Sequence, residues 1–434
     1  MKLNVAIAMG IALSSAQLSS AQTLEQAVAH TLKTNPNIKA QYNEYVSKRY
    51  LRRASGGQYL PSIDLDAGIG FQDTESPESD FGDLTGREVT LSLTQLLWDG
   101  NATLNDMDRT AADAESVRLQ LVADAQDIAL EVTKIYLDAR QAFDLLELSE
   151  GNLRTHKKIY TDIKKRVDSG IGSTADLSQV EARIAKAHGN LLAAQNNMYD
   201  VHTQFTRIVG MAPQGLIYPR ADENFIPPSL QDAIDMAFED HPVIKVSQAD
   251  VDSAKFQYKQ SKGVNLPTFT IEASQTWRDD MDGLAGSDDE TSLMLRMRYN
   301  LYNGGSDSAR QDNFAYQLNR SKDLRDSAYR QVEEGLRLAW SGLDLSRQQK
   351  LFLADHVDSA SNTVVAYEKQ YKIGKRTLLD VLNTENELFE ARKSFLDAKY
   401  GEQYAKYRIL NATGVLLQSL RVESPQEWSQ QLEY

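Results

Sequence analysis

The chain has 434 residues, no cysteine and a formal net charge of -14 at pH 7. Without cysteine there can be no disulfide, no thiolate metal site and no lipid anchor on an N-terminal cysteine. The acidic balance argues against a nucleic-acid partner. The mean hydropathy is -0.47, and beyond the first residues no stretch approaches the roughly 20 apolar residues of a membrane-spanning helix. We therefore expect no helical span there.

The first residues are typical of a secretory signal. Lys2 precedes an apolar stretch from Leu3 to Leu13, and small residues at positions 19–21 follow it. This order of a positive charge, an apolar region and a small-residue cleavage site predicts export. We expect residues 1–21 to be a signal peptide and the mature chain to begin at Gln22.

The mature sequence contains an internal duplication. Residues 24–61 match residues 230–267 at an offset of 206, and residues 100–210 match residues 304–414 at an offset of 204. The matching pairs include Leu24 and Leu230, Pro36 and Pro242, Pro61 and Pro267, Gly100 and Gly304, Gly170 and Gly374, Asp176 and Asp380, and Gly210 and Gly414. We expect a first repeat at 22–210, a linker or equatorial segment at 211–228, a second repeat at 229–414 and a C-terminal equatorial tail at 415–434.

Each repeat contains two segments in which apolar and polar residues alternate, the period of a strand. The expected strands are about 62–72 and 88–98 in the first repeat and about 268–278 and 290–302 in the second. Pro61 and Pro267 mark the helix-to-strand transitions, because a helix has to stop there. The apolar faces include Ile63, Leu65, Ile69, Val89, Leu91, Leu93, Phe269, Ile271, Leu293 and Leu295, and the opposite faces include Asp64, Asp66, Glu272, Arg296 and Arg298.

An apolar face opposite a charged face fits a sheet between hydrocarbon and water. Each segment has the ~9 to 11 residues that a tilted strand needs to cross a bilayer. A soluble sheet with one solvated face fits the same pattern. If the sheet lies in a membrane, however, its edges cannot face lipid, and four strands cannot close a barrel with a lumen. Several protomers must then share one barrel.

The rest of each repeat is predicted to be a long helical hairpin, at about 101–210 and about 305–414. From Leu121 to Leu146 apolar residues keep the 4-3 spacing of a coiled coil without a miss. The first helix of about 68 residues would be roughly 100 Å long, too long for a compact globule. Its counterpart keeps Val332 and Leu336 in register, although Arg325, Ser346 and Lys350 occupy equivalent core positions.

Each hairpin turn combines a helix stop with a helix start. Gly170 and Gly374 suit the left-handed position that ends a helix. Ser173 and Thr377 then suit N-caps, and Asp176 and Asp380 lie three residues further on, where a capping-box acid belongs.

The duplicated order of helix pair, Leu-Pro, strands and long hairpin resembles the TolC family of outer-membrane channel-tunnels over nearly the whole mature chain. The turn from Tyr371 to Leu382, with Tyr-x-x-Gly-x-Arg-Thr before an Asp-Val-Leu helix start, resembles the periplasmic entrance of that family. The resemblance implies an α+β membrane protein: a homotrimer with four strands per protomer in an outer-membrane β-barrel, continued through the periplasm by an α-helical coiled-coil barrel.

The resemblance also implies roles at the entrance. Tyr371 and Arg376 would belong to the network that closes it, and Asp380 would form an acidic ring. Asn383 stands where the family has a second acid, so a second ring would be uncharged. Alternatively, Asp380 is only the capping-box acid of Thr377. Asp176 is the corresponding capping-box acid in the first repeat, where Gly172 stands in place of Arg376.

Two acidic segments between the strands could bind Ca²⁺ through carboxylates, although neither has the spacing of a known calcium loop, which favours solvated external loops. They contain Asp73, Glu75, Glu78, Asp80 and Asp83, and Asp279, Asp280, Asp282, Asp288, Asp289 and Glu290. Arg296 and Arg298 could tune passage or pair with Asp64, Asp66 and Glu272. The sequence has no HExxH, GxSxG or GxxxxGK[ST] motif, so we expect no enzyme, metal or cofactor.

The leading hypothesis is an outer-membrane exit duct that receives substrate from an inner-membrane ABC exporter, or an RND pump, and a periplasmic membrane-fusion adaptor. The expected lack of a lipid anchor favours type I secretion of a large adhesin or toxin. A multidrug efflux channel is the alternative within this class. A periplasmic coiled-coil scaffold is the alternative from another class, but it has no use for lipid-facing strands.

Overall fold

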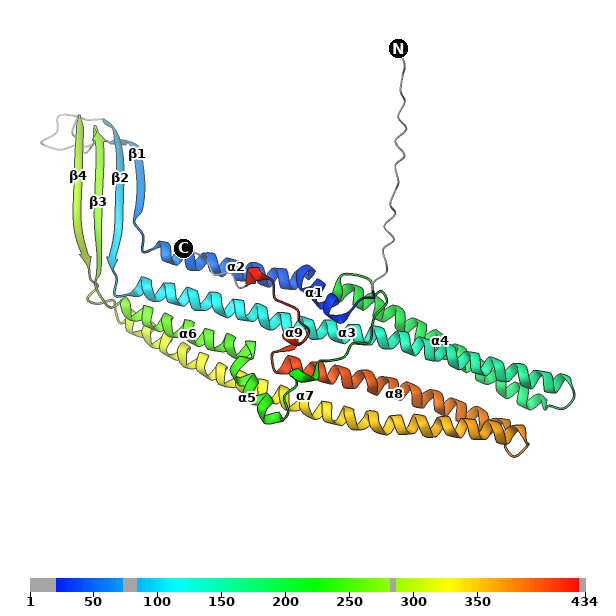
Figure 1. The fold of residues 1–434 in the computed structure, drawn as a ribbon. Coiled ribbons are helices and arrows are strands. Elements are labelled where there is room, and N and C mark those ends of the chain that lie inside the picture. The colour runs from blue at the N-terminus through cyan, green and yellow to red at the C-terminus, as the bar shows by residue number, and fades with distance from the viewer. Residues whose placement is uncertain (1–20, 73–83, 282–285, 429–434) are drawn as a thin grey trace, which may run out of the picture.

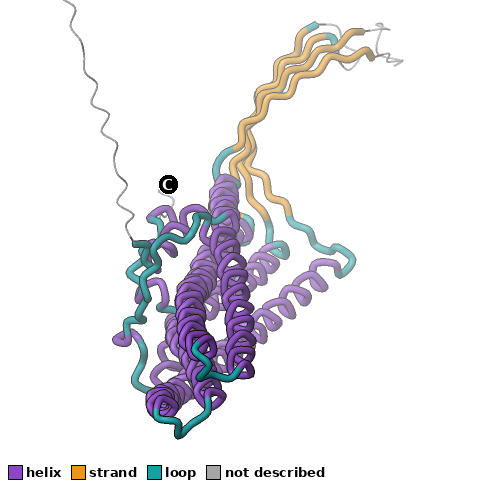
Figure 2. The backbone as a smooth tube through the Cα atoms, turned by 90° about the vertical axis from the view of Figure 1, so that its right-hand side faces the viewer, coloured by secondary structure: helices purple, strands orange, loops and turns teal. Residues whose placement is uncertain are grey.

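The computed structural model describes residues 21–72, 84–281 and 286–428. Apart from Ala21, the expected signal peptide lies outside these residues. A four-stranded antiparallel sheet stands at one end of a long helical body, and the tips of two helical hairpins form the other end (Figure 1). Seen from the side, the strands continue beyond the helices as one curved ribbon (Figure 2).

The same order of elements occurs twice. The first series is α1 (Leu24–Thr34), α2 (Pro36–Gly57), β1 (Ser62–Gln72), β2 (Leu84–Trp98), α3 (Ala102–Asp168) and α4 (Thr174–Val209). The second is α5 (Leu230–Asp240), α6 (Pro242–Gly263), β3 (Thr268–Asp279), β4 (Ser287–Arg298), α7 (Ser306–Lys372) and α8 (Leu378–Ala412). The short helices η1 (Glu223–Phe225), α9 (Leu416–Ser419) and η2 (Gln426–Trp428) lie between and after them.

Prolines and capping residues fix where the helices start and stop. Pro36 and Pro242 occupy the first position of α2 and α6, where a missing N–H costs nothing. Pro61 and Pro267 each lie directly before a strand, after a short turn that ends the helix. The chain therefore changes from helix to strand at the same place in both halves.

The sheet has the order β1-β2-β3-β4, and all neighbouring strands are antiparallel. Strands were expected to begin at about 88 and 290, but β2 begins at Leu84 and β4 at Ser287. Backbone pairing continues beyond the alternating pattern because ladder hydrogen bonds do not require apolar side chains. The last strand was expected to reach 302 but ends at Arg298, which faces Thr268, the first residue of β3. Within the protomer β3 offers no partner beyond that point.

The long helices bury the predicted core positions. In α3, Leu121, Ala125, Val132 and Ala139 are at most 1% exposed. In α7, Leu336 and Leu343 are buried, while Lys350 at an equivalent position forms an ion pair with Glu402 of α8. α3 and α7 each have 67 residues, or about 100 Å of helix. Among the helices of the described residues, none is both long enough and apolar enough to cross a membrane.

The largest core lies midway along the body. It joins α1, α3, α4, α8 and α9, and its fully buried members include Leu24, Tyr136, Phe205 and Leu410. The segment between the halves is held to this core, because the Tyr136 hydroxyl donates to the carbonyl of Ile217 at 2.9 Å. Smaller clusters lie further along the hairpins, so the protomer is a rod with its core distributed along it.

Candidate functional site

The sheet presents one apolar face without a cover. Ile69, Leu293 and Leu295 are 72%, 76% and 70% exposed within the protomer. The register aligns their strands so that Leu65 faces Leu91 and Ile271 faces Leu295 on this same face. Exposure of so many aliphatic side chains on one face would be unfavourable in water. Their arrangement fits contact with hydrocarbon.

The opposite face is polar and contains ion pairs between strands. Arg278 of β3 lies 3.7 Å from Glu88 of β2 and 3.3 Å from Glu290 of β4. Arg296 lies 2.7 Å from Glu272 on the neighbouring strand. Of the three partners predicted for Arg296 and Arg298, which were Asp64, Asp66 and Glu272, Glu272 is found with Arg296. This charged face suits water.

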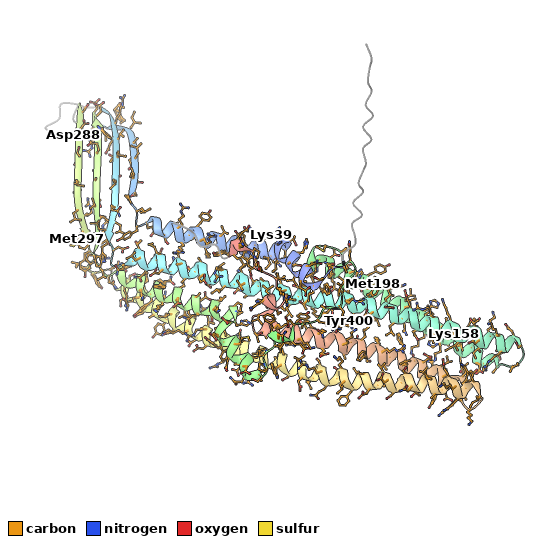
Figure 3. The ribbon with its side chains drawn as sticks, viewed as in Figure 1. Lys39, Lys158, Met198, Asp288, Met297 and Tyr400 are labelled. Atoms are coloured by element: carbon orange, nitrogen blue, oxygen red, sulfur yellow. The ribbon has the colours of Figure 1, made fainter. Side chains whose placement is uncertain are left out.

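The acidic segments differ from the expected loops. Residues 73–83 and Asp282 lie outside the described residues. Asp279 belongs to β3, and Asp288, Asp289 and Glu290 belong to β4, where Arg278 pairs with two of them. Asp288 lies at the outer end of the strand and Met297 at the end near the helices (Figure 3). In the described part of the chain, no group of three or more His, Asp or Glu residues could hold a metal ion.

The two hairpin turns have the same backbone form. Gly170 and Gly374 have φ of 73° and 75°. The amide of Ile171 donates to the carbonyl of Arg166 at 2.9 Å, and the amide of Lys375 donates to that of Gln370 at 2.9 Å. These are Schellman turns, in which glycine adopts the left-handed conformation at no steric cost.

The helix starts after the turns differ. Thr377 and Asp380 form a complete capping box: each side chain accepts from the other's backbone N–H, at 3.3 and 3.1 Å. The hydrogen bonds from Thr377 lower the pKa of Asp380, and Arg376 adds to this. The box predicted for the first turn is wrong, because Ser173 accepts from Ala175 instead of Asp176. Because Ser173 caps the amide two residues later instead of three, the reciprocal bond of a capping box is not formed by the Asp176 carboxylate.

The two hairpins contact each other near their tips. Ile163 of α3, Val180 of α4 and Leu378 and Leu382 of α8 form a buried apolar cluster. Tyr371 lies at its edge, where the guanidinium of Arg166 lies 5.3 Å from the ring centroid and forms a long hydrogen bond of 3.5 Å to the hydroxyl. The tips are therefore joined through both apolar and cation–π contacts.

Polar contacts extend this junction along α4 and α8. Arg183 donates to the amide oxygen of Asn383 at 2.7 Å, and Lys186 donates to that of Asn386 at 2.8 Å. The sequence predicted a role for Asn383 but did not indicate Arg183, Lys186 or Arg166. The matched three-residue spacing of the basic and amide residues was a signal, but it does not identify which helices face each other.

Arg376 does not reach Tyr371 within the protomer. Its guanidinium lies 4.2 Å from the ring centroid of Tyr367 and donates to Gln370 at 3.2 Å, so the side chain folds back from the turn onto the end of α7. Asp380 is half-exposed and Asn383 is exposed. The structure therefore brings Tyr371 and Asn383 to the first hairpin and leaves Arg376 and Asp380 beside the second turn.

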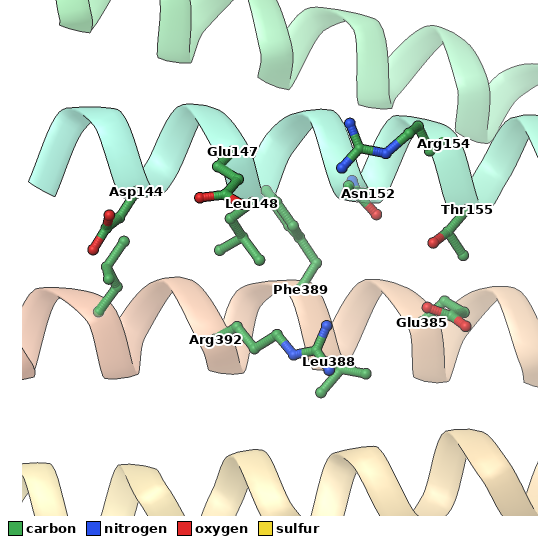
Figure 4. A pocket seen from close by; sticks show the side chains of 12 residues that line it. Asp144, Glu147, Leu148, Asn152, Arg154, Thr155, Glu385, Leu388, Phe389 and Arg392 are labelled. Atoms are coloured by element: carbon green, nitrogen blue, oxygen red, sulfur yellow. The ribbon is translucent and has the colours of Figure 1, made fainter. Parts of the chain in front are cut away.

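A groove of about 450 Å³ lies between α3 and α8 (Figure 4). It contains apolar and charged side chains, and burial together with nearby Glu368 raises the pKa of Glu385, although Arg392 opposes the shift. Its lining includes Asp144, Glu147, Leu148, Arg154, Glu385, Leu388, Phe389 and Arg392. Such a mixture fits contact with another polar helical surface.

An uncovered apolar sheet, a charged opposite face and two joined helical hairpins define the class of outer-membrane channel proteins with a helical extension. The chain matches the sequence model of the outer membrane efflux protein family over residues 27–211 and again over residues 233–415. It belongs to that family. The two matches fall on the two halves of the duplication.

Individual relatives cover most of the chain. It is similar to the outer membrane efflux protein BepC of Brucella suis, with 28% identity over 341 residues, 78% of this chain and 74% of BepC. It is 23% identical over 441 residues to the outer membrane protein TolC of Escherichia coli, covering 96% of this chain and 87% of TolC. With the alkaline protease secretion protein AprF of Pseudomonas aeruginosa it shares 23% identity over 399 residues, 89% of this chain and 83% of AprF.

The fold agrees with solved structures. The outer membrane protein VceC of Vibrio cholerae matches with a TM-score of 0.75 at 14% identity, covering 92% of this chain and 95% of VceC. The predicted fold class is confirmed: a trimeric outer-membrane β-barrel with four strands per protomer, continued by an α-helical barrel. The protein resides in the outer membrane and extends into the periplasm.

Proposed function

We propose that this protein is the exit duct of a tripartite export system. The observation that carries the proposal is the sheet. Residues along all four strands alternate between an apolar face and a charged face, and β1 and β4 are left as edges. Strand edges cannot face lipid. Three protomers supply twelve strands, enough to close a barrel around an aqueous lumen.

The polar faces line this lumen and the helical hairpins continue it into the periplasm. The sheet alternation also weighs against a periplasmic scaffold, because a scaffold in water would leave Leu293 and Leu295 exposed without purpose. The sequence has no nucleotide-binding loop, so the energy for export comes from a partner. The partners are an inner-membrane transporter and a periplasmic adaptor, and the groove between α3 and α8 receives the adaptor.

The entrance lies at the hairpin tips. Tyr371 lies in the last helical turn of α7, Arg376 in the hairpin turn itself, and Asp380 and Asn383 in the first two turns of α8. The contacts of Arg166 with Tyr371 and of Arg183 with Asn383 hold the second hairpin against the first. Outward movement of the second hairpin would break both contacts, so they favour the closed entrance.

The substrate is proposed to be a large protein, such as an adhesin or toxin, secreted by a type I system with an ABC exporter. The similarity to AprF, a protein named for alkaline protease secretion, supports this proposal. A multidrug efflux channel paired with an RND pump is the second candidate, supported by the similarity to BepC, named as an efflux protein.

Conductance tests the duct itself. Purified protein in planar bilayers is expected to conduct ions, weakly in the native form and more strongly in the double variant Tyr371→Phe, Arg376→Ser. A matched control is Tyr199→Phe, an exposed tyrosine on α4 away from the tips. A complete lack of conductance in all three proteins would overturn the channel.

A deletion strain tests the substrate. Loss of one large secreted protein with unchanged drug susceptibility supports type I secretion. Increased susceptibility to several drugs with an intact set of secreted proteins supports efflux. Complementation with the native chain must restore whichever property was lost.

A further inference from the structure

We propose that His156, in the core of the first hairpin, makes the entrance sensitive to pH: the neutral imidazole keeps the hairpin tips together, and its protonation opens them. His156 lies on α3 twelve residues before that helix ends at Asp168, or roughly 18 Å along the helix. The inference rests on the proposed duct and specifies how its entrance is regulated.

His156 occupies a core position of the coiled coil. The 4-3 spacing of α3 continues beyond Leu146 toward the tip through Ser149, Leu153, His156, Tyr160 and Ile163. All of these except Tyr160 are buried. An imidazole therefore stands at a position where a coiled coil normally has an apolar side chain.

The residue opposite His156 on α4 is an alanine. Ile163 of α3 packs with Val180 of α4 in the apolar cluster near the tips, and the two helices run antiparallel (Figure 1). Seven residues further from the tip on each helix are His156 and Ala187, and Ala187 is 1% exposed. The methyl group of Ala187 cannot form a hydrogen bond with the imidazole.

The imidazole has an unsatisfied polar atom. His156 is 3% exposed, and within the described part of the chain its buried Nδ1 has no hydrogen-bond partner. Buried polar atoms are hydrogen-bonded in most native structures, and an apolar side chain would fill the same position without this cost. An ionisable side chain with a pKa near neutrality is what a histidine offers instead.

The charges around His156 oppose its protonation. Burial lowers the pKa of His156, and the positive charges of Arg183 and Lys186 on α4 lower it further. On α3 itself, the neighbouring Arg154 and Lys157 are exposed cations. The closed hairpin therefore favours the neutral imidazole.

The helix α8, which packs against both α3 and α4, does not change this balance. Its Asn383 and Asn386 approach α4 with uncharged amides. Its Glu385 faces Thr155 across the groove (Figure 4). Burial raises the pKa of Glu385, so its negative charge is lost at a higher pH than that of an ordinary glutamate.

The two cations on α4 connect His156 to the entrance. Arg183 and Lys186 donate to Asn383 and Asn386 of α8, at 2.7 and 2.8 Å. A proton on His156 adds a third positive charge beside them in the buried core. Movement of α4 away from α3 hydrates the imidazolium and separates these charges. The same movement carries both cations away from α8, which frees the second hairpin to move outward.

The direction of the effect follows from linkage. In the open state the imidazole is hydrated and has its ordinary pKa of about 6.5, whereas in the closed state the pKa of His156 is lower. The open state therefore binds more protons, and acid shifts the equilibrium toward it. The closed entrance is fully favoured above about pH 6.5 and is weakened as the pH falls below that value.

Conductance at two pH values tests this inference. The native protein in planar bilayers is expected to conduct about five-fold more at about pH 5.5 than at about pH 7.5, the low end of the usual coupling between two sites. His156→Gln stays polar but does not titrate, and it should lose this increase, as should His156→Leu. The matched control is His188→Gln, which replaces an exposed histidine beside Ala187 on α4 and should keep the increase.

A histidine that only fixes the register of the hairpin gives a different result. Both His156 variants would then change the conductance by the same factor at the two pH values, and the acid increase would persist. That result, loss of the increase in His188→Gln, or a native protein without any increase overturns the inference while the duct stands. Absence of conductance in every one of these proteins, at both pH values, counts against the duct itself.

A measurement on the native protein needs no variant. Deuterium exchange at the imidazole C2–H, followed by mass spectrometry of the peptide that contains His156, reports its titration in the intact protein. We expect a midpoint below about 6.5 and slower exchange than at the exposed His188. A midpoint at or above about 6.5, or exchange as fast as at His188, would show that the closed hairpin does not oppose the proton and would overturn the inference.

Discussion

The segment between the two halves lies over a group of charged side chains. Replacing Glu402 with glutamine tests whether these charges hold the segment to the helices. Glu402 of α8 is 5% exposed. It forms ion pairs with Lys350 of α7 and, at 3.2 Å, with Lys406. Lys406 also reaches Glu223 in η1 at 2.6 Å. The network thus links α7, α8 and the connecting segment.

The expected loss follows from what remains after the substitution. Removing one partner of a buried ion pair costs about 3 to 5 kcal/mol. Lys406 retains Glu223, and the Lys350 side chain is 38% exposed and can rehydrate. We therefore expect the lower end, about 3 kcal/mol, or on the order of a hundred-fold in the unfolding equilibrium. The double variant Glu402→Met, Lys406→Met leaves no buried charge and should recover most of the loss.

Urea unfolding in detergent measures this difference. Trp340 packs against the same buried cluster as Ile226, the residue that follows η1, so its fluorescence reports on this region. Asp138→Asn, which breaks an exposed pair with Lys134, is the control and should cost less than about 1 kcal/mol. If Glu402→Gln is as stable as the control, the network does not hold the segment and the reasoning is refuted.

The pH dependence has a definite sign. Burial alone would raise the pKa of Glu402, but hydrogen bonds from Lys350 and Lys406 outweigh it and lower the pKa from 4.5. The stabilisation is therefore fully present above pH 4.5 and is lost as the pH falls through the lowered value. In the Glu402→Gln variant, the free energy of unfolding should therefore lack this decrease at acid pH.

Three further substitutions address the hairpins. Thr377→Ala removes the cap of α8 and should cost about 0.5 to 2 kcal/mol, seen as faster hydrogen exchange in its first turn; unchanged exchange would contradict the capping role. Asp380→Asn should weaken cation preference and block by multivalent cations if an acidic ring lies near the pore axis, and unchanged selectivity in bilayers would leave Asp380 only its cap. Glu385→Gln should stabilise the protein at pH 7, because burial raises the pKa of Glu385 and penalises its charged form; the gain should vanish below pH 4.5, and a gain that persists there would refute this assignment.

The fold could be predicted where local spacing encodes it. Period-2 alternation placed the four strands, and the 4-3 spacing from Leu121 to Leu146 identified residues that α3 buries or half-buries. The turn glycines Gly170 and Gly374 have the expected positive φ. Each of these signals depends on residues close in sequence.

Contacts between residues that are distant in the sequence could not be predicted from local spacing. Lys350 interrupts the heptad pattern because Glu402 faces it, a fact that requires knowing how α7 packs against α8. Arg166 and Arg183 contact Tyr371 and Asn383 only because the first hairpin lies beside the second. The two hairpin turns look equivalent in sequence, yet only Thr377 completes a capping box.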